Sequence, residues 1–304
     1  MEPLARSSFA IEMDAGAGAG SGSGSKDATG SSGLSLSDGP VISIIPEYTI
    51  GIIGFGTFGQ FLAKGFIEHA RAAGKRLKVV GTSRADYTAE ASAIGASYAL
   101  GWREFFEHKP DVIILSTSIL SFASVLRRLP RDHLEGCLLV DVLSVKQHPK
   151  DMLLDETIVP ASADILLTHP MFGPDSGKDG WQGLPFVYEV ARVGSDPAKQ
   201  ARLDFALGLF KDPGCSMVPM QADRHDELAA GTQFVTHLTG RVLHRLRLAP
   251  CEIATRGFEA LLQLVENTCK DSFDLFLALY RHNKSSRRQL DALAAALDEI
   301  RGEL

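Results

Sequence analysis

A glycine-rich turn between an apolar run and a helical pattern constrains this sequence most. Thr49–Phe55 is apolar and rich in β-branched residues, which predicts a buried strand, and Phe58–Gly74 carries apolar residues at helical spacing. Residues 54–59 between them read GxGxxG. The first glycine permits the tight turn, the second lets a pyrophosphate approach the backbone, and the third allows close helix–strand packing. We therefore expect a dinucleotide to bind at Gly54, Gly56, Thr57, Phe58 and Gly59.

Strand and helix patterns alternate after this turn. Further strands are predicted at Leu77–Ser83, Asp111–Ser118, Leu138–Ser144, Ile165–His169, Pro185–Ala191 and Cys215–Met220, with helices at Thr88–Ile94 and Pro197–Phe210. Such alternation predicts an α/β fold, a Rossmann-type, doubly wound, mostly parallel sheet. After about Gln221 only helical periodicity remains, so an all-helical C-terminal domain should follow. The expected domains are a Gly/Ser-rich tail (1–47), an NADP-binding Rossmann domain (48–221) and a helical substrate-binding and dimerisation domain (222–304).

Composition narrows the possible partners and compartments. The net charge of −6 favours neither nucleic acid nor an anionic membrane, and no apolar run approaches the roughly 18 residues that span a bilayer. The four cysteines lie far apart, which argues against a zinc site or disulfide framework. The stretch Ala15–Gly33 predicts a disordered tail or linker, or a remnant of a longer precursor. Glu2, Glu12 and Asp14 fit a transit peptide poorly, and composition fits a cytoplasmic setting equally well.

The end of the second strand indicates which nicotinamide cofactor is used. An NAD site places an acid there, whereas an NADP site supplies a cation for the 2′-phosphate. Here Ser83 and Arg84 follow the strand, and Asp86 lies slightly beyond, where it can cap the next helix. This favours NADP; the alternative is that Arg84 is a solvated surface charge. Thr117 and Ser118 end the next long strand and should line the nucleotide, unless Ser118 only caps a helix.

Two polar groups stand at the ends of later strands, where a doubly wound fold keeps its active site. His169 is followed by a rigid Pro/Gly loop, and its near-neutral pKa suits a general base. Ser144 follows the neighbouring strand and can orient that imidazole or the nicotinamide. Taken alone, a residue such as His169 is more often a structural histidine than a catalytic one, and one such as Ser144 is more often a helix cap.

These segments resemble the prephenate/arogenate dehydrogenase family, in its plant-type branch. The resemblance runs from about Thr49 to Leu304 and is carried by IGIIGFGTFGQFLAK, TSRADY, STSIL, VDVLSVKQHPK, LTHPMFGPDSGKDGW, GTQFVTHLTGR and RGFEALL. HPMFGP together with DVLSVK is highly specific, and the glycine turn is not. The resemblance implies that NADP takes a hydride from the ring carbon bearing the 4-hydroxyl of arogenate, that the ring carboxylate leaves as carbon dioxide, and that tyrosine forms without a metal.

The resemblance also implies roles for individual residues. His169 would bond the 4-hydroxyl and accept its proton, while Ser144 would bond that hydroxyl or position His169 and the nicotinamide. Gln233 and His237, one helical turn apart, would face the substrate; the alternative is a solvated face or a subunit contact. Plant-type relatives work in plastids, and the family suggests a homodimer formed through the helical domain. The segment 225–248 should present one helical stripe: Leu228, Thr232, Val235, Leu238, Val242 and Leu246.

Asp271 is expected to select the substrate. In plant-type relatives an acid here accompanies preference for arogenate, whose side chain carries an ammonium, and a neutral residue accompanies preference for prephenate. From the sequence alone Asp271 is also a good helix N-cap. One departure concerns Glu266, which stands where many bacterial relatives have an arginine that holds the ring carboxylate. Arg241 and Arg256 are candidates to replace it.

Three other functions compete with arogenate dehydrogenase. Prephenate dehydrogenase shares the chemistry and differs in the substrate's side chain. A β-hydroxyacid or ketol-acid dehydrogenase would need a lysine or a metal-binding acid pair in the helical domain, a constellation that the sequence does not show. A non-catalytic NADP-sensing protein would bind the cofactor without turnover.

Overall fold

The computed structural model describes residues 48–304. The predicted tail, residues 1–47, lies outside the described residues. The described residues form one compact unit. Within the described part, no helix is both long and apolar enough to cross a membrane.

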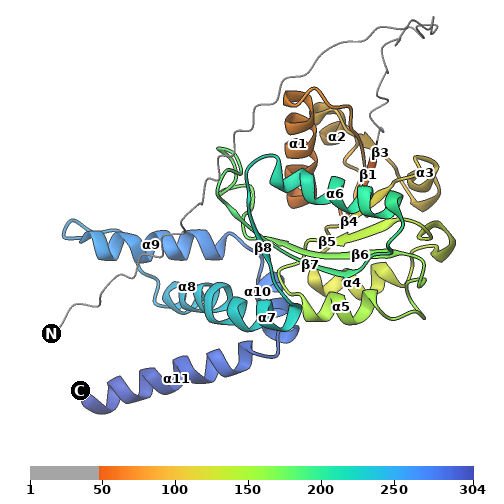
Figure 1. Cartoon of the computed structure of the whole chain (residues 1–304). Helices are drawn as coiled ribbons and strands as arrows, with labels where there is room; N and C mark the ends of the chain where they lie inside the picture. The colour runs from red at the N-terminus through yellow and green to blue at the C-terminus, as the bar shows by residue number, and fades with distance from the viewer. Residues whose placement is uncertain (1–47) are drawn as a thin grey trace, which may run out of the picture. The chain divides into compact units, whose positions relative to one another are not determined.

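An eight-stranded sheet forms the centre of this unit (Figure 1). Its strand order is β3-β2-β1-β4-β5-β6-β7-β8, and the order reverses between β1 and β4, which lie side by side. The strands are β1 (Thr49–Ile53), β2 (Lys78–Thr82), β3 (Ser97–Tyr98), β4 (Val112–Leu115), β5 (Leu138–Asp141), β6 (Asp164–Pro170), β7 (Pro185–Arg192) and β8 (Ser216–Pro219). The six strands from β3 to β6 in this order, with β2, β1, β4 and β5 between them, pair in parallel, so their carboxyl ends lie at one edge of the sheet. Only β7 runs antiparallel to its neighbour β6, and it pairs in parallel with β8.

Helices cover both faces of the sheet, so the central strands are buried on both sides. One face carries α1 (Thr57–Ala72), α2 (Thr88–Ile94) and α6 (Pro197–Lys211), whose buried side chains pack on Ile50 and Ile52. The other carries α3 (Trp102–Glu107), α4 (Ile119–Leu126), α5 (Gln147–Leu153) and a short 3-10 turn (Arg131–His133). Continuous apolar strands such as Val112–Leu115 suit this two-sided burial.

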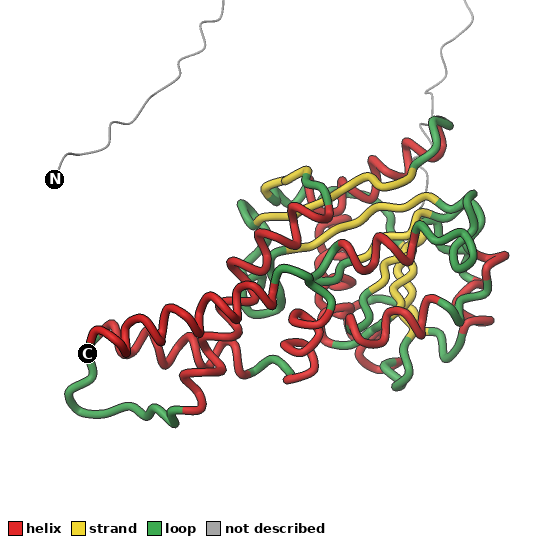
Figure 2. The backbone as a smooth tube through the Cα atoms, turned by 90° about the horizontal axis from the view of Figure 1, so that it is seen from below, coloured by secondary structure: helices red, strands yellow, loops and turns green. Residues whose placement is uncertain are grey.

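The regular elements after β8 are all helices, joined by loops (Figure 2). The elements are α7 (Ala222–Ala229), a π turn (Ala230–Phe234), α8 (Val235–Arg245), α9 (Arg256–Cys269), α10 (Phe273–Arg281) and α11 (Ser286–Glu303). Phe234, Leu238 and Leu279 join the apolar core under α4 and α5. The predicted fold class is therefore confirmed: a Rossmann-type, mostly parallel sheet followed by a helical region. The exact boundary at residue 221 stays a prediction.

The structure adds two details to the sequence prediction. The two-residue strand β3 and helix α3 had no recognised pattern. Of the stripe predicted over 225–248, Leu238 is buried, whereas Leu228, Val242 and Leu246 are exposed. The stripe therefore meets the core at Leu238 and the surface at both of its ends.

Candidate functional site

The three glycines of the turn after β1 have the geometries that the motif predicts. Gly54 adopts φ +99°, in the left-handed region that favours glycine, and a Cβ there would overlap the backbone of Ser116. A Cβ on Gly59 would overlap the carbonyl of Gly54, so this glycine permits close packing of helix on strand. A Cβ on Gly56 would meet nothing within 4 Å. The second glycine thus faces open space, where a diphosphate can approach the backbone.

A cleft of about 930 Å³ opens at this edge of the sheet. It is bounded by the glycine turn, by the segments after β4, β5 and β6, and by the loop between α9 and α10. Ten predicted site residues line it: Gly56, Thr57, Phe58, Gly59, Thr117, Ser118, Ser144, His169, Gln233 and Asp271. Residues separated by more than two hundred positions in the sequence are therefore brought together. Gly54, Ser83, Arg84 and His237 are not among its lining residues.

The groups around the glycine turn fit a dinucleotide. Helix α1 begins here with Gly56 as its N-cap and no side chain capping it, which leaves backbone N–H groups for phosphate oxygens. The hydroxyls of Ser116 and Thr117 are buried and have no hydrogen-bond partner in the structure. Buried polar atoms are nearly always paired, so these hydroxyls indicate a polar ligand at the end of β4. Ser118 lines the cleft and also caps α4, where its side chain accepts from the Ser121 N–H at 3.2 Å.

The end of β2 lies against the same turn, because the Gly54 N–H donates to the Thr82 carbonyl at 2.9 Å. Ser83 follows, half-buried, and then Arg84, which is exposed and forms no ion pair with any residue from 48 to 304. The carboxylate of Asp86 instead accepts from the Thr88 N–H and hydroxyl, which lowers its pKa. This acid is engaged with Thr88 at the start of α2, although the N-cap of that helix is Tyr87.

His169 lies at the end of β6 and is only 4% exposed. Its Nδ1 is 2.8 Å from Nε2 of His225, and Nδ1 of His225 is 2.9 Å from Oδ1 of Asp226. Burial, followed by the neighbouring His225 and Lys146, holds the pKa of His169 well below its usual range. The imidazole is therefore neutral near pH 7, as a proton acceptor must be.

This chain of three residues also selects the tautomer of His169. A carboxylate only accepts hydrogen bonds, so Nδ1 of His225 carries a proton and donates it to Asp226. When Nε2 of His225 carries no proton, it is an acceptor, and Nδ1 of His169 donates to it. The remaining nitrogen, Nε2 of His169, has a free lone pair. Because His169 lines the cleft, this nitrogen is the basic atom available to a ligand.

Asp226 is fixed by several donors. Its Oδ1 accepts from the backbone N–H of Lys146 at 2.7 Å and its Oδ2 from that of Gln147 at 3.0 Å, at the start of α5. Asn283, before α11, donates to the Asp226 carbonyl at 2.7 Å. Sequence reasoning missed both His225 and Asp226, since two polar residues in a charged helical segment carry no recognisable pattern.

The segment that holds Ser144 is anchored by a buried ion pair. Lys146 and Asp141 are at most 2% exposed, and the Lys146 ammonium donates to the Asp141 carboxylate and to the Thr168 carbonyl. Asp141 also accepts from the Leu143 N–H at 3.1 Å and from the Thr168 N–H at 3.3 Å. These bonds tie β5 to β6 beside His169. Ser144 does not cap a helix, because α5 begins at Gln147 after Lys146.

The helical region supplies the opposite wall. The side-chain amide oxygen of Gln233 is buried without a hydrogen-bond partner in the structure. Gln233 lies in the π turn, and π turns are frequent at functional sites. Nε2 of His237 is 3.7 Å from Oδ2 of Asp271, and burial lowers the pKa of His237 although Asp271 opposes this. Asp271 is not the helix cap that the sequence allowed. Ser272 caps α10, its side chain accepting from the Leu275 N–H at 3.1 Å, so the Asp271 carboxylate is not used as a cap.

The basic residue that lines this wall is not one of the two arginines that the sequence indicated. Arg241 donates to the backbone carbonyls of Asp271 and Ser272 at 2.8 and 3.0 Å, and does not line the cleft. Arg256 is exposed at the first residue of α9 and does not line it either. Lys270, which the sequence analysis did not single out, does line it.

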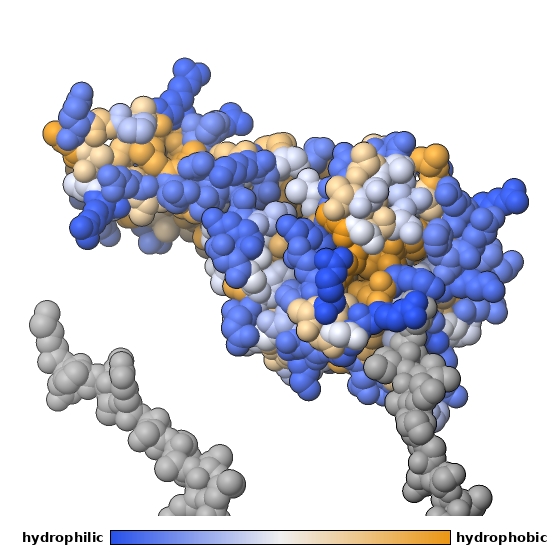
Figure 3. All heavy atoms as spheres, turned by 90° about the horizontal axis from the view of Figure 1, so that it is seen from above, coloured by the Kyte–Doolittle hydropathy of each residue, from blue (hydrophilic) through white to orange (hydrophobic). Residues whose placement is uncertain are grey.

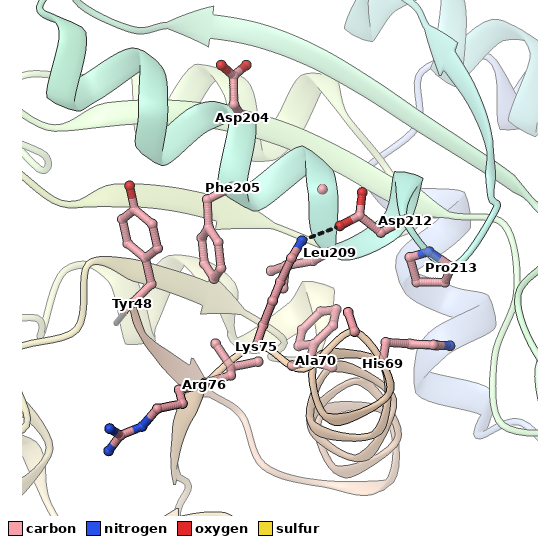
Figure 4. Close-up of a pocket in the computed structure, with 14 residues that line it drawn as sticks. Tyr48, His69, Ala70, Lys75, Arg76, Asp204, Phe205, Leu209, Asp212 and Pro213 are labelled. Atoms are coloured by element: carbon pink, nitrogen blue, oxygen red, sulfur yellow. Dashed lines mark hydrogen bonds and ion pairs between the residues drawn. The ribbon is translucent and has the colours of Figure 1, made fainter. Parts of the chain in front are cut away.

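A second cavity, of about 340 Å³, lies between α1 and α6 (Figure 4). Tyr48 and Phe205 stack there with ring centroids 4.2 Å apart, and Lys75 bridges to Asp212 at 2.8 Å. None of the predicted site residues lines it. The cleft at the carboxyl edge of the sheet is therefore the candidate active site.

Comparisons with known proteins show which family the chain resembles. Residues 67–193 match the family model "Prephenate dehydrogenase, nucleotide-binding domain", and residues 242–304 match "TYRAAT1-like, C-terminal domain". Arogenate dehydrogenase 2, chloroplastic, from Arabidopsis thaliana is 45% identical over 84% of this chain and 69% of its own length. Arogenate dehydrogenase 1, chloroplastic, from the same plant is also 45% identical over 84% of the chain, which spans 39% of that longer relative.

The fold is shared with a solved structure. The prephenate dehydrogenase from Aquifex aeolicus, in complex with hydroxyphenyl propionate and NAD+, has a TM-score of 0.63 at 16% identity, over 85% of this chain and 91% of that one. The fold and the site thus define a nicotinamide-nucleotide-dependent dehydrogenase. Within that class, the chain belongs to the prephenate/arogenate dehydrogenase family, in its plant-type branch.

Proposed function

We propose that this protein oxidatively decarboxylates arogenate to tyrosine with NADP as hydride acceptor. The observation that carries the proposal is the chain Asp226–His225–His169, which presents a neutral imidazole with a free Nε2 to a cleft that also holds the glycine turn. A dehydrogenase that oxidises a ring alcohol needs such a base beside its cofactor.

The protein's residues would move a proton in a reaction that combines hydride transfer with loss of carbon dioxide. His169 accepts the proton of the 4-hydroxyl as the hydride leaves the same carbon. Bound NADP supplies the hydride acceptor. The bond to the ring carboxylate then breaks, its electrons enter the ring, carbon dioxide departs, and the proton returns from His169 to the phenolic oxygen. Ser144, beside His169 in the cleft, would donate to or orient the hydroxyl.

Ser83 and Arg84 support the choice of NADP over NAD. Both follow β2 beside the glycine turn, and the acid in this segment, Asp86, is bonded to Thr88. A guanidinium suits the doubly charged 2′-phosphate, and the ribose hydroxyl of NAD would leave it without a partner.

Asp271 supports arogenate over prephenate. Its carboxylate lines the cleft, is not used as a cap, and is free to pair with the substrate ammonium. Prephenate has a keto group at that position and would leave the carboxylate unpaired. Gln233 lines the same wall, and His237 acts through its contact with Asp271.

A homodimer through the helical region is part of the proposal. Leu246 and Ile253 are 63% and 88% exposed, and Leu297 and Ile300 on α11 are exposed as well. Apolar side chains gather over the outer part of the helical region in Figure 3. Such a surface fits a second copy of the chain. The Arabidopsis relatives are named chloroplastic, and we extend a plastid location to this protein.

Initial rates of NADPH and NADH formation test the function directly. Purified protein is assayed with arogenate and with prephenate, each with NADP and with NAD. We expect a strong preference for arogenate with NADP. Activity on prephenate alone would favour the related prephenate reaction, and binding of NADP with no turnover of either substrate would refute a catalytic role.

A further inference from the structure

We propose that Lys270 binds the carboxylate of the substrate's amino-acid side chain, next to the ammonium held by Asp271. The inference rests on the proposed function, because it assigns a partner to one group of arogenate. That substrate carries two carboxylates and one ammonium. Among residues 48–304, Lys270 is the one lysine or arginine that lines the cleft, whereas Asp175 and Asp271 both line it as acids.

The positions of the two residues match the geometry of an amino acid. Lys270 and Asp271 are consecutive, so their Cα atoms are about 3.8 Å apart. The ammonium and carboxylate of an amino acid are attached to a single carbon, so two groups that bind them must come from neighbouring positions in the cleft. Both residues belong to the short connection between α9, which ends at Cys269, and α10, which begins at Phe273.

This connection is held in place from both sides. Arg241 donates to the carbonyls of Asp271 and Ser272, and its guanidinium lies 5.4 Å from the Phe273 ring centroid and 5.3 Å from that of Phe276. Ser272 caps the following helix. The backbone that carries the two opposite charges is therefore positioned before a ligand arrives, which reduces the entropy lost on binding.

The Lys270 ammonium is available to a ligand. Its present partner is Glu266, at 3.2 Å, with the two side chains 53% and 60% exposed. Exposed pairs four residues apart on a helix contribute only about 0.3–0.5 kcal/mol. Glu266 does not line the cleft, so the ammonium can exchange this weak pair for a substrate carboxylate. Arg241 does not line the cleft, and its Nη2 donates to the backbone carbonyls of Asp271 and Ser272.

The two residues should therefore have separable effects. Arogenate and prephenate both carry a carboxylate on the side chain, so Lys270 serves both substrates. Only arogenate carries the ammonium, so Asp271 alone distinguishes them. Lys270 would set how tightly either substrate binds, and Asp271 which one is preferred.

Three small ligands that lack the ring carboxylate test this division. Tyrosine has both charges, tyramine has only the ammonium, and 3-(4-hydroxyphenyl)propionate has only the carboxylate. Dissociation constants are measured with NADP present for the wild type, Lys270→Gln and Asp271→Asn. We expect Lys270→Gln to weaken tyrosine and hydroxyphenylpropionate about tenfold and leave tyramine unchanged. Asp271→Asn should weaken tyrosine and tyramine and spare hydroxyphenylpropionate.

Two variants control for structural effects. Lys64→Gln removes a lysine with the same kind of partner, Glu68, four residues away at 3.9 Å and with 60% and 58% exposure, on a helix face outside the cleft. It should leave all three constants unchanged. Lys270→Arg, which keeps the charge, should restore most of the affinity.

The outcomes separate this inference from the proposed function. If the wild type turns over arogenate and binds tyrosine, but Lys270→Gln binds tyrosine and hydroxyphenylpropionate as the wild type does, Lys270 is not the carboxylate partner. A higher KM for arogenate in that variant, with unchanged binding of all three ligands, would assign Lys270 to the ring carboxylate and overturn the inference. Absence of turnover and of tyrosine binding in the wild type would instead reject the proposed function.

Discussion

The two walls of the cleft differ in how deeply their functional residues are buried. On the sheet side, Asp141, Lys146 and His169 are at most 4% exposed and joined by hydrogen bonds to neighbouring strands. On the helical side, the Asp271 side chain is 46% exposed and that of Lys270 53%, and α9 buries a single residue, Thr268.

This difference separates chemistry from selection. Burial shifts the pKa of a base and fixes its tautomer, because few geometries satisfy every buried polar group. Half-exposed charges exchange partners at small cost, which suits recognition of a charged substrate. We therefore expect variants on the buried wall to lower kcat, and variants at exposed positions to change KM and selectivity.

The largest effect should come from the base itself. His169→Asn removes the acceptor and should lower kcat by about 10²–10⁴, while the dissociation constant for NADP stays unchanged. In the wild type, kcat should fall only as the pH drops through the lowered pKa of His169, below 6.5, since protonation abolishes the acceptor. Steady-state rates across pH and a cofactor titration measure both. Near wild-type turnover in the variant would remove His169 from the mechanism.

A smaller loss is expected from the residue that sets the tautomer. Asp226→Asn leaves one of the donors His225, Lys146 and Gln147 facing an amide N–H, a mismatch worth about 1–3 kcal/mol. If this whole energy is lost from the stabilisation of the transition state, kcat drops roughly 5- to 150-fold. Asp223→Asn, in the first turn of the same helix but exposed, is the matched control. A variant whose thermal stability falls while its kcat is unchanged would make Asp226 purely structural.

The helical side of the cleft should respond differently to substitution. Asp271→Asn removes the partner of the substrate ammonium and should shift the ratio of kcat/KM for arogenate over prephenate by about tenfold, mainly through the KM for arogenate. Asp274→Asn, exposed on α10 and outside the cleft, should change nothing. Equal kinetics of the Asp271 variant and the wild type on both substrates would contradict the assignment.

The smallest effect tests whether the exposure of a residue, and not the wall to which it belongs, decides if its substitution changes KM or kcat. Arg84 belongs to the sheet side but is exposed, so Arg84→Ala should raise the KM for NADP by about five- to tenfold with little change in kcat or in the KM for NAD. Arg103→Ala, whose side chain is 96% exposed on α3, serves as the control. A fall in kcat without a change in KM would break the division between buried and exposed residues.

The sequence predicted the parts of the molecule that depend on local patterns. Apolar runs gave most strands of the sheet, and the spacing of Gly54, Gly56 and Gly59 predicted a conformation that the backbone angles and close approaches match. His169 and Ser144 were located by their positions after strands. These features are local because a strand, a turn and the edge to which a parallel strand points are set by a few neighbouring residues.

Tertiary contacts decided what the sequence could not show. His225 and Asp226 matter because α7 packs beside β6 and the start of α5, a contact between residues 56 to 80 positions apart. Ser272 rather than Asp271 caps α10, although both are good cap residues. Of the predicted apolar stripe, Leu238 packs in the core while Leu246 is exposed, which only the position of α8 in the fold decides.

The bond between His169 and His225 joins the two regions at the reactive group itself. A nucleotide-binding region on its own would keep the glycine turn and the hydroxyls of Ser116 and Thr117, yet it would lack the acceptor that dictates which imidazole nitrogen is free. Catalytic competence is therefore a property of the assembled pair. Exchange of the nucleotide-binding region between relatives, by recombination or by design, would succeed only if the first turns of α7 are inherited with it.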